Sequence, residues 1–302
     1  MADEAQLSPF VFACQGGLVL DQSTFAMQPG MALELQNFEP DISGGYRRIS
    51  GYAKWNTNIV PQTAASTEPV LMVALFNSKV IAARGTKIFE AGTTGSWSEI
   101  DTGRTSAGRY TFFRYNLAGT DFIIWADGAN HATKYDGTTL TDINASGAPA
   151  NPKFVTGFKD HLFFAGASST PQQLTFTAPF TDNDFQTSNG AGTIKVDSNI
   201  TGLFPFRDAL FIFCEERIFK LTGSALADFA IQPVTREIGC LNGFTIQEFA
   251  GDIVFLGPDG LRTVAGTERI GDVELGTISR PVQKRFQELT DVDEFTSLVI
   301  PD

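Results

Sequence analysis

The feature that most constrains this chain is a pair of apolar strands that recurs through its last two thirds. From Val70 onward, short runs rich in Phe, Ile and Leu alternate with turns that contain Gly or Asp. A period of about 40–48 residues, with about four short strands in each period, is typical of the blades of a β-propeller. The recurring runs are residues 70–76 with 79–83, 121–125, 160–166, 208–213 and 252–257.

These runs are continuously apolar, unlike strands that have one face in water. In a propeller each blade stacks between two neighbours, so both faces of its sheet are buried. We therefore predict an all-β, β-propeller-like domain over residues 70–302, with blade boundaries near residues 105, 148, 195 and 236. The last blade is either incomplete or closed by the N-terminal segment. A β-sandwich with irregular strands is the alternative fold.

Residues 1–69 lack the repeat and predict an irregular N-terminal arm that ends in a polar linker. Gly and Pro punctuate this region, and residues 31–38 fit either a short helix or a strand. The arm nevertheless holds too many large apolar side chains to leave in water. We expect them to dock on a neighbouring molecule or on the chain's own propeller. These side chains are Phe10, Val11, Phe12, Phe25, Phe38, Tyr46 and Trp55.

One segment near the C-terminus has helical spacing instead. Residues 279–289 begin with Ser279 as a candidate cap and Pro281 in the first turn. Val282, Phe286 and Leu289 then share one face, which predicts a short helix. Residues 295–300 look like the start of another strand.

Charge and cysteine usage exclude several classes of protein. The 302 residues include 34 acidic and 22 basic side chains, a net charge of −12, which argues against a protein that grips nucleic acid. No apolar run reaches the roughly 20 residues of a membrane-spanning helix. Cys14, Cys214 and Cys240 are far apart and form no CxxC, so we interpret them as buried thiols of a protein assembled in a reducing cytoplasm.

The sequence offers no recognisable catalytic or metal-binding constellation. The only histidines are His131 and His161, and both are predicted to be surface turn residues. Two His and three scattered Cys match no zinc pattern, and residues 182–184 lack the Gly and distal Glu of a calcium loop. We therefore expect a protein that is not an enzyme and that carries no metal or cofactor.

The most distinctive local signal is a basic stretch within the acidic arm. Gly44 and Gly45 permit a tight turn, and a strand after them would place Tyr46 and Arg48 on one face and Arg47 on the other. We predict that this stretch contacts an acidic partner surface during assembly. An exposed strand that is merely solvated by its arginines is the alternative. The candidate contact residues are Tyr46, Arg47, Arg48, Tyr52 and Trp55.

The order of short motifs resembles a family of bacteriophage tail proteins. The arm resembles the opening of tail hub, tail nozzle and packaged-DNA stabilisation proteins of short-tailed bacteriophages, and segments of the later blades resemble them too. The arm motifs are Gly16-Gly17-Leu18, Pro29-Gly30, Asn37-Phe38-Glu39, the run from Gly44 to Arg48, and Gly51-Tyr52. The later ones lie at 206–213, 238–243, 255–261 and 279–289.

This resemblance implies a propeller-based structural protein of the virion tail. Such a protein is assembled in the host cytoplasm, forms a homo-oligomeric ring, expected to be a hexamer, and joins the portal and adaptor ring. It continues the DNA channel, so that double-stranded DNA is retained and later conducted through it without specific binding. The family's function rests on no catalytic residue, so no active-site position is carried over.

A carbohydrate-binding or carbohydrate-cleaving propeller of a receptor-recognition tail component is the alternative function. An enzyme of that kind would need carboxylates and aromatic platforms that converge in a central cleft. In this sequence the acidic residues fall mostly at turns.

Overall fold

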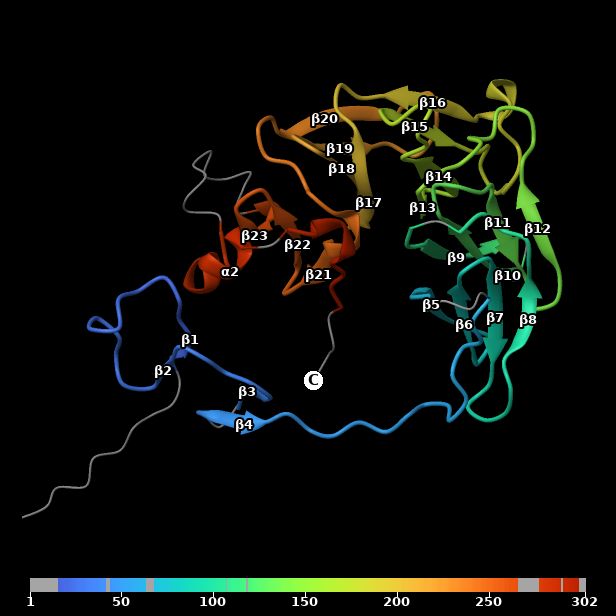
Figure 1. Ribbon diagram of the computed structural model, residues 1–302. Helices are drawn as coiled ribbons and strands as arrows, with labels where there is room; N and C mark the ends of the chain where they lie inside the picture. The colour runs from blue at the N-terminus through green and yellow to red at the C-terminus, as the bar shows by residue number, and fades with distance from the viewer. Residues whose placement is uncertain are drawn as a thin grey trace, which may run out of the picture.

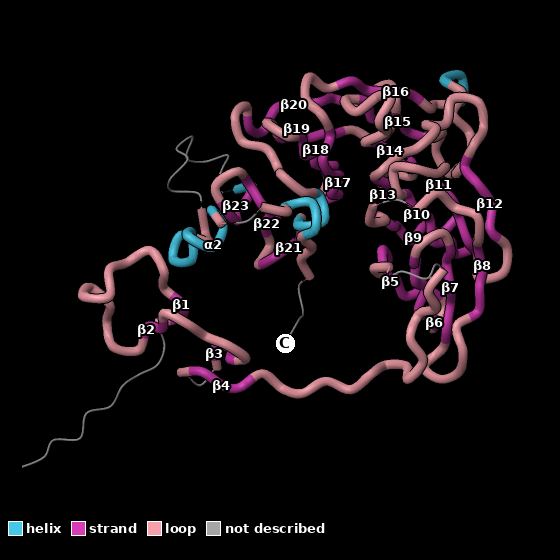
Figure 2. Tube along the Cα trace, viewed as in Figure 1, coloured by secondary structure: helices cyan, strands magenta, loops and turns pink. Residues whose placement is uncertain are grey.

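The protein consists of β-sheets arranged in an arc, with a long N-terminal arm (Figures 1 and 2). The computed structural model describes residues 16–41, 44–63, 68–106, 108–117, 119–265, 277–288 and 290–298. Four four-stranded sheets and one three-stranded sheet follow one another along these residues. The prediction of an all-β, propeller-like fold is confirmed, and each of these five sheets is one blade.

Each blade is an antiparallel meander in which consecutive strands are neighbours. Blade I contains β5 (Val70–Phe76), β6 (Lys79–Arg84), β7 (Lys87–Ala91) and β8 (Ser98–Asp101), and blade II contains β9 (Thr111–Leu117), β10 (Thr120–Ala126), β11 (Ala132–Tyr135) and β12 (Leu140–Ile143). Blade III contains β13 (Phe154–Phe158), β14 (His161–Ala165), β15 (Gln173–Phe176) and β16 (Gly192–Lys195). Blade IV contains β17 (Ile200–Phe206), β18 (Ala209–Cys214), β19 (Ile218–Thr222) and β20 (Ala230–Thr235), and blade V contains β21 (Gln247–Phe249), β22 (Asp252–Gly257) and β23 (Gly260–Thr263). Residues 105, 148 and 236 lie between blades, and residue 195 ends β16.

Tight turns join the first two strands of the blades and set their register. In blade III, Lys159 and Asp160 both have positive φ, 47° and 64°, which is the geometry of the mirror-image turns that suit twisted hairpins. Asn77 and Ser78 make the matching turn in blade I, with φ of 48° and 61°. Phe158 is consequently paired with His161. The recurrent Asp of the sequence pattern therefore belongs, in blade III, to a turn.

The core lies between blades, and alternate residues of one strand serve two interfaces. In β10, Ile123 and Trp125 pack towards blade I, whereas Ile124 and Ala126 pack towards blade III. In β18, Leu210 and Ile212 pack towards blade III, in the same way. The middle sheets are therefore apolar on both faces, as the continuous runs predict.

The prediction that His161 is a surface turn residue is wrong. His161 is the first residue of β14 and only 1% of its surface is exposed. The two-residue turn is complete at Asp160, so the strand starts at once and the ring points into the core, edge-on to Phe176 and Phe229. Its Nδ1 lies 2.5 Å from the carbonyl oxygen of Thr177. His131, by contrast, is exposed, as predicted.

The arm contains two small strand pairs and no helix in its described residues. β1 (Gly17–Leu18) pairs in parallel with β2 (Met31–Ala32), and β3 (Phe38–Pro40) pairs in antiparallel with β4 (Tyr46–Arg48). Residues 31–38 therefore start with a strand rather than forming a helix. Figure 1 shows the arm running from blade I across the open side of the arc towards α2. The amide of Leu20 donates to the carbonyl of Pro281 there, at 2.7 Å.

The predicted helix near the C-terminus is present but short. A 3₁₀ turn at Arg280–Val282 leads into α2 (Gln283–Gln287), and Leu289 lies outside the described residues. Ser279 does not cap this helix with its side chain. Its hydroxyl instead accepts a hydrogen bond from the amide of Leu261, because strand β23 needs a partner at that edge.

The predicted strand over residues 295–300 is not formed where it is described. Residues 295–298 follow a 3₁₀ turn at Val292–Glu294 and pair with no strand, while 299 and 300 lie outside the described residues. Two further 3₁₀ turns occupy Thr187–Asn189 and Gly243–Thr245. Within the described part of the chain, none of the helices has the length and apolar character needed to cross a bilayer.

Candidate assembly interface

The β3–β4 hairpin, between the base of the arm and the β1–β2 pair, carries three of the predicted contact residues, Tyr46, Arg47 and Arg48. Its turn depends on Gly44 and Gly45, whose φ values of 93° and 90° are costly for other residues. Glu39 lies opposite Arg47 and Phe38 lies opposite Arg48. The predicted strand is therefore present, and its alternation places Tyr46 and Arg48 on one face and Arg47 on the other.

The two arginines differ in their surroundings. Arg47 Nε lies 2.7 Å from Glu39 Oε1, in an ion pair whose side chains are 55% and 39% exposed. Such an exposed pair contributes about 0–1 kcal/mol at most. Arg48 is exposed on the opposite face of the hairpin. The hairpin therefore presents one neutralised and one outward-facing guanidinium.

The aromatic residues of the interface are divided between internal contacts and solvent. The hydroxyl of Tyr46 donates to the carbonyl of Gly30 at 3.1 Å, which ties the hairpin to the β1–β2 region. Tyr52 is 94% exposed and Trp55 is 42% exposed. The structure thus brings Tyr46, Arg47 and Arg48 together on one hairpin, while Tyr52 and Trp55 follow it along an extended segment.

The base of the arm is anchored on blade I of the same chain. Asn58 Nδ2 donates to the carbonyl of Gly95 at 2.7 Å, and Trp97 Nε1 donates to the carbonyl of Asn58 at 2.9 Å. Arg84 Nε donates to the carbonyl of Glu68 at 2.9 Å. The arm therefore docks on its own propeller at its base, whereas the segment with Tyr52 and Trp55 remains uncovered.

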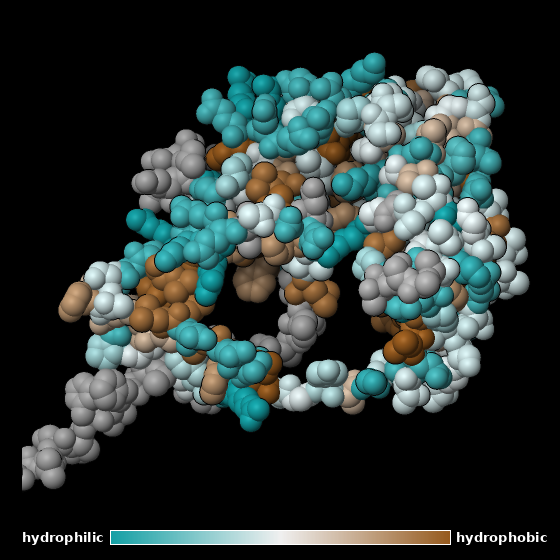
Figure 3. All heavy atoms as spheres, in the orientation of Figure 1, coloured by the Kyte–Doolittle hydropathy of each residue, from teal (hydrophilic) through white to brown (hydrophobic). Residues whose placement is uncertain are grey.

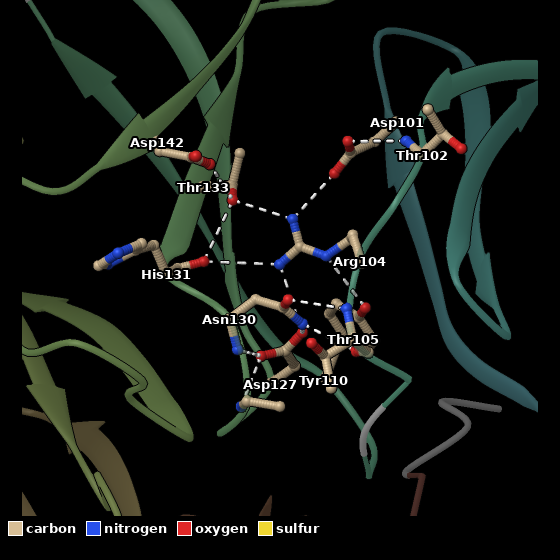
Figure 4. A network of polar contacts seen from close by, with 11 residues as sticks. Asp101, Thr102, Arg104, Thr105, Tyr110, Asp127, Asn130, His131, Thr133 and Asp142 are labelled. Atoms are coloured by element: carbon tan, nitrogen blue, oxygen red, sulfur yellow. Dashed lines mark hydrogen bonds and ion pairs between the residues drawn. The ribbon is translucent and has the colours of Figure 1, made fainter.

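A buried ionic network, which the sequence analysis missed, joins blades I and II (Figure 4). Arg104 NH1 lies 2.8 Å from Asp101 Oδ2, and Arg104 NH2 lies 3.3 Å from Asp127 Oδ2. Tyr110 and Thr133 accept from the same guanidinium, at 3.2 and 3.1 Å. One sequence signal could have indicated this network. Arg104 lies between the apolar runs of blades I and II, and the Asp127-Gly128 turn follows the second run.

Hydrogen bonds hold this network in its charged form. Burial by itself would raise the pKa of Asp127, but the amides of Ala129 and Asn130, the Asn130 side chain and Arg104 together lower that pKa below its usual value. Burial raises the pKa of Tyr110 to about 12. His131 takes part in the network only through its backbone carbonyl oxygen, which lies 3.5 Å from Arg104 NH2. The network is fully paired, which indicates a structural role.

The inner strands surround a central cavity of about 380 Å³. β9, β13 and β17 line it together with the residues before β21, and Figure 3 shows apolar atoms around the hollow inside the arc. Phe112, Phe113, Phe154, Phe204 and Phe244 are among its lining residues. None of the lining residues carries a carboxylate. The cavity therefore offers aromatic surfaces without the acid pair of a glycosidase.

The cysteines and the acidic loop make no metal centre in the described residues. No cluster of three or more His, Cys, Asp or Glu side chains suited to a metal occurs there. Cys214 and Cys240 are buried free thiols, as predicted, and burial raises the pKa of each to about 12; Cys14 lies outside the described residues. Asp182 is paired with Lys134 rather than open to a cation.

The fold is similar to that of known propellers. The chain matches the extracellular domain of a protein described as a hybrid two-component system from B. thetaiotaomicron, with 14% identity and a TM-score of 0.50, over 75% of this chain and 31% of that one. It also matches the AfRom2 CNH domain (9% identity, TM-score 0.45, 65% and 68% covered) and the Neurospora crassa Pan2 WD40 domain (11%, 0.43, 65% and 61%). At 14% identity, the likeness to the first of these structures shows the fold alone.

No family model and no curated protein matches the chain by sequence. The chain spans about a third of the two-component protein domain that it matches, 31% of its length.

Proposed function

We propose that this chain is a structural protein of a short-tailed bacteriophage tail, a nozzle or hub that forms a ring around the DNA channel. It retains packaged DNA and conducts it during ejection, and it performs no catalysis. It is assembled in the host cytoplasm, and in the virion it adjoins the portal and adaptor ring. The support comes from the order of the arm motifs and from the geometry of the arm.

The observation that carries the proposal is the exposure of aromatic side chains along the arm. Tyr52 is 94% exposed and Phe25 is fully exposed, although both belong to a segment whose base is anchored by hydrogen bonds to blade I. An anchored base with uncovered aromatic side chains suits docking on a neighbouring subunit, where aromatic side chains and arginine carry much of the binding energy. Arg48 adds a cation that faces away from Glu39 and can pair with an acidic neighbour.

The net charge suits passage of DNA. At −12 per chain, a ring of several subunits repels the phosphate backbone, so DNA that moves through it meets no deep binding minimum. Two basic side chains of the arm, Arg47 and Arg48, lie on the hairpin, where they serve protein contacts. In this arrangement the shape of the ring, rather than affinity for DNA, retains the packaged DNA.

The test is a double substitution, Arg47→Glu with Arg48→Glu, followed by assembly onto purified tail complexes. We expect loss of attachment to the upstream ring, because both cations are reversed at the interface. Electron microscopy of the unaltered protein should show a six-fold ring with an axial channel.

The matched control is Lys195→Glu with Arg236→Glu, which reverses two exposed cations, one at the end of β16 and one just after β20. This variant should assemble normally. If the arginine variant assembles as well as the control does, the hairpin is only a solvated strand. A stable monomer under all conditions would contradict the ring itself.

A second candidate, a carbohydrate-binding propeller, is favoured by one observation. The central cavity exposes aromatic rings, and 43% of Phe112 is accessible. Sugars stack on such rings, whereas cleavage would need carboxylates that the lining lacks. Host-surface glycans bound by the intact protein, and lost in Phe112→Ala, would favour this function over the tail ring.

A further inference from the structure

The interface between blades III and IV is filled with aromatic rings at one end, beside the turns that join the first two strands. His161 begins β14 opposite Phe158, and Phe163 lies opposite Phe176 of β15. Phe229, just before β20 of blade IV, closes over this group, with its ring centroid 5.4 Å from that of His161 and 5.2 Å from that of Phe176. His161, Phe163 and Phe176 are each at most 1% exposed, so these rings leave little space between the two sheets.

The corresponding positions of blade IV carry a smaller and a charged side chain. Ala209 begins β18 directly after its two-residue turn, and Phe211 lies opposite Lys220 of β19. The register therefore places Ala209 where blade III has His161, and Lys220 where blade III has Phe176. Because residues directly opposite each other on neighbouring strands point to the same face, Lys220 faces blade V as Phe211 does.

A cavity of about 430 Å³ lies at this position between blades IV and V. Its apolar walls include Phe206 and Phe211 of blade IV and Val264, just after β23 of blade V. The volume falls within the range of small-molecule sites, which combine apolar walls with a few polar groups. The cavity thus occupies the space that aromatic rings fill in the preceding interface.

Three of the charged side chains at this cavity already have partners. Arg207 donates from NH2 to a backbone carbonyl in the turn between β21 and β22, at 2.9 Å. The carboxylate of Asp252 accepts a hydrogen bond from the amide of Ala265 at 3.1 Å. Asp208 points into solvent, with Oδ1 3.4 Å from Nζ of Lys159.

Lys220 differs from these three residues. It is half-buried in the wall of the cavity, and its ammonium forms no ion pair or hydrogen bond with any residue that the structure describes. An anion that accepts a charge-assisted hydrogen bond is the natural partner of such a cation. The cavity therefore suits a ligand that joins one negative charge to an apolar body.

We propose that the cavity between blades IV and V binds a small carboxylate with an apolar body. The carboxylate pairs with the ammonium of Lys220. The apolar body lies against Phe206, Phe211 and Val264, in the space that corresponds to the ring of Phe176 in blade III. The inference does not depend on the proposed tail function.

The experiment is a calorimetric titration of the unaltered protein with phenylacetate, which should bind saturably. Phenylacetamide has the same shape without the charge and should bind at least about tenfold more weakly, because it forms no charge-assisted hydrogen bond with Lys220. Acetate, which lacks the ring, should also bind more weakly. Phenylacetate that does not saturate the protein at millimolar concentrations, or that binds no better than phenylacetamide, would overturn the inference.

Substitutions of Lys220 then locate the site. Lys220→Met keeps an apolar side chain but removes the charge, so it should weaken phenylacetate binding at least about tenfold and leave phenylacetamide binding almost unchanged. Lys220→Phe supplies the ring that blade III has at this position and should abolish binding of both compounds. Thermal unfolding of each variant checks that it folds.

The control variant is Lys195→Met, at an exposed cation at the end of β16. It removes the same charge outside the cavity and should bind phenylacetate as the unaltered protein does. If Lys220→Met binds phenylacetate as tightly as this control does, the ligand lies elsewhere and the inference is wrong.

Discussion

Blade III and the arm contain similar side chains in opposite surroundings. In blade III, Phe163 and Phe176 are fully buried and their ring centroids lie 5.2 Å apart. In the arm, Phe25 and Tyr52 are almost wholly in contact with water. Each blade packs on other blades of the same chain, whereas the arm contacts the rest of the chain through hydrogen bonds at its base and at Leu20 and leaves Phe25 and Tyr52 uncovered.

This difference separates the contacts that stabilise the isolated chain from the contacts that would form only in an assembly. The middle blades bury both faces of their sheets against other blades of the same chain, so these contacts stabilise the isolated chain. The aromatic side chains of the arm gain burial only when another surface arrives. Substitutions in the two regions should therefore affect different measurements, and this sets the predictions below.

The largest effect is expected for Phe163→Ala, at the interface of blades III and IV. Phe163 contacts Phe158, Phe176 and Phe229, and its removal leaves a cavity. The free energy of unfolding should fall by about 3–5 kcal/mol, measured by urea denaturation of the isolated protein. A loss below about 1 kcal/mol would mean that the interface between blades is loosely packed.

The next effect concerns Arg104→Met, which removes the cation from the network between blades I and II. Asp127 would then be left as a buried carboxylate, and Asp101 as a half-buried one, without their counter-ion. We expect a loss of about 3 kcal/mol in the same denaturation experiment. Arg236→Met, at an exposed cation just after β20, is the control and should change stability by less than about 0.5 kcal/mol.

A smaller effect is expected from acid. The pKa of Asp127 is lower in the folded protein than its ordinary value of 3.8, so its ionisation contributes stability above that pH. This contribution is lost as the pH falls through the folded-state pKa. The stability difference between the unaltered protein and Asp127→Asn should therefore shrink from pH 5 to pH 3. A difference that is constant over this range would show that Asp127 does not titrate as the network requires.

The repeat allowed most of the blades to be predicted. Both faces of every middle strand must be apolar, so each strand is a continuous apolar run, and these runs recur at about 40–48 residues. Such runs can be recognised from the local sequence alone. The Gly44-Gly45 turn and the strand after it were predictable for a similar reason: glycine alone adopts φ near 90° without strain. These features are encoded within a few residues of where they act.

Features that depend on distant partners were not predictable. His161 is buried because a two-residue turn ends one position before it and Phe229, from the next blade, closes over its ring. The Arg104 network joins the nearby Asp101 to Asp127 and Thr133 of blade II, and only the stacking of blades I and II brings these two to Arg104. Likewise, no local pattern shows that Asn58 bonds to the carbonyl of Gly95 and anchors the arm.

The smallest effect is expected for Tyr52→Ala, and it is the sharpest test of the comparison. Tyr52 is 94% exposed and belongs to no blade, so the stability of the isolated chain should change by less than about 0.5 kcal/mol. In assembly onto the tail complex the same change should weaken attachment at least about tenfold, because a buried aromatic anchor at an interface contributes about 2 kcal/mol or more. Under conditions in which Phe163→Ala still folds, we expect the opposite result: the free energy of unfolding is lower, and attachment to the tail complex is unchanged. If Tyr52→Ala destabilises the isolated chain as Phe163→Ala does, the arm packs on its own propeller along its whole length, and the division between the two regions is wrong.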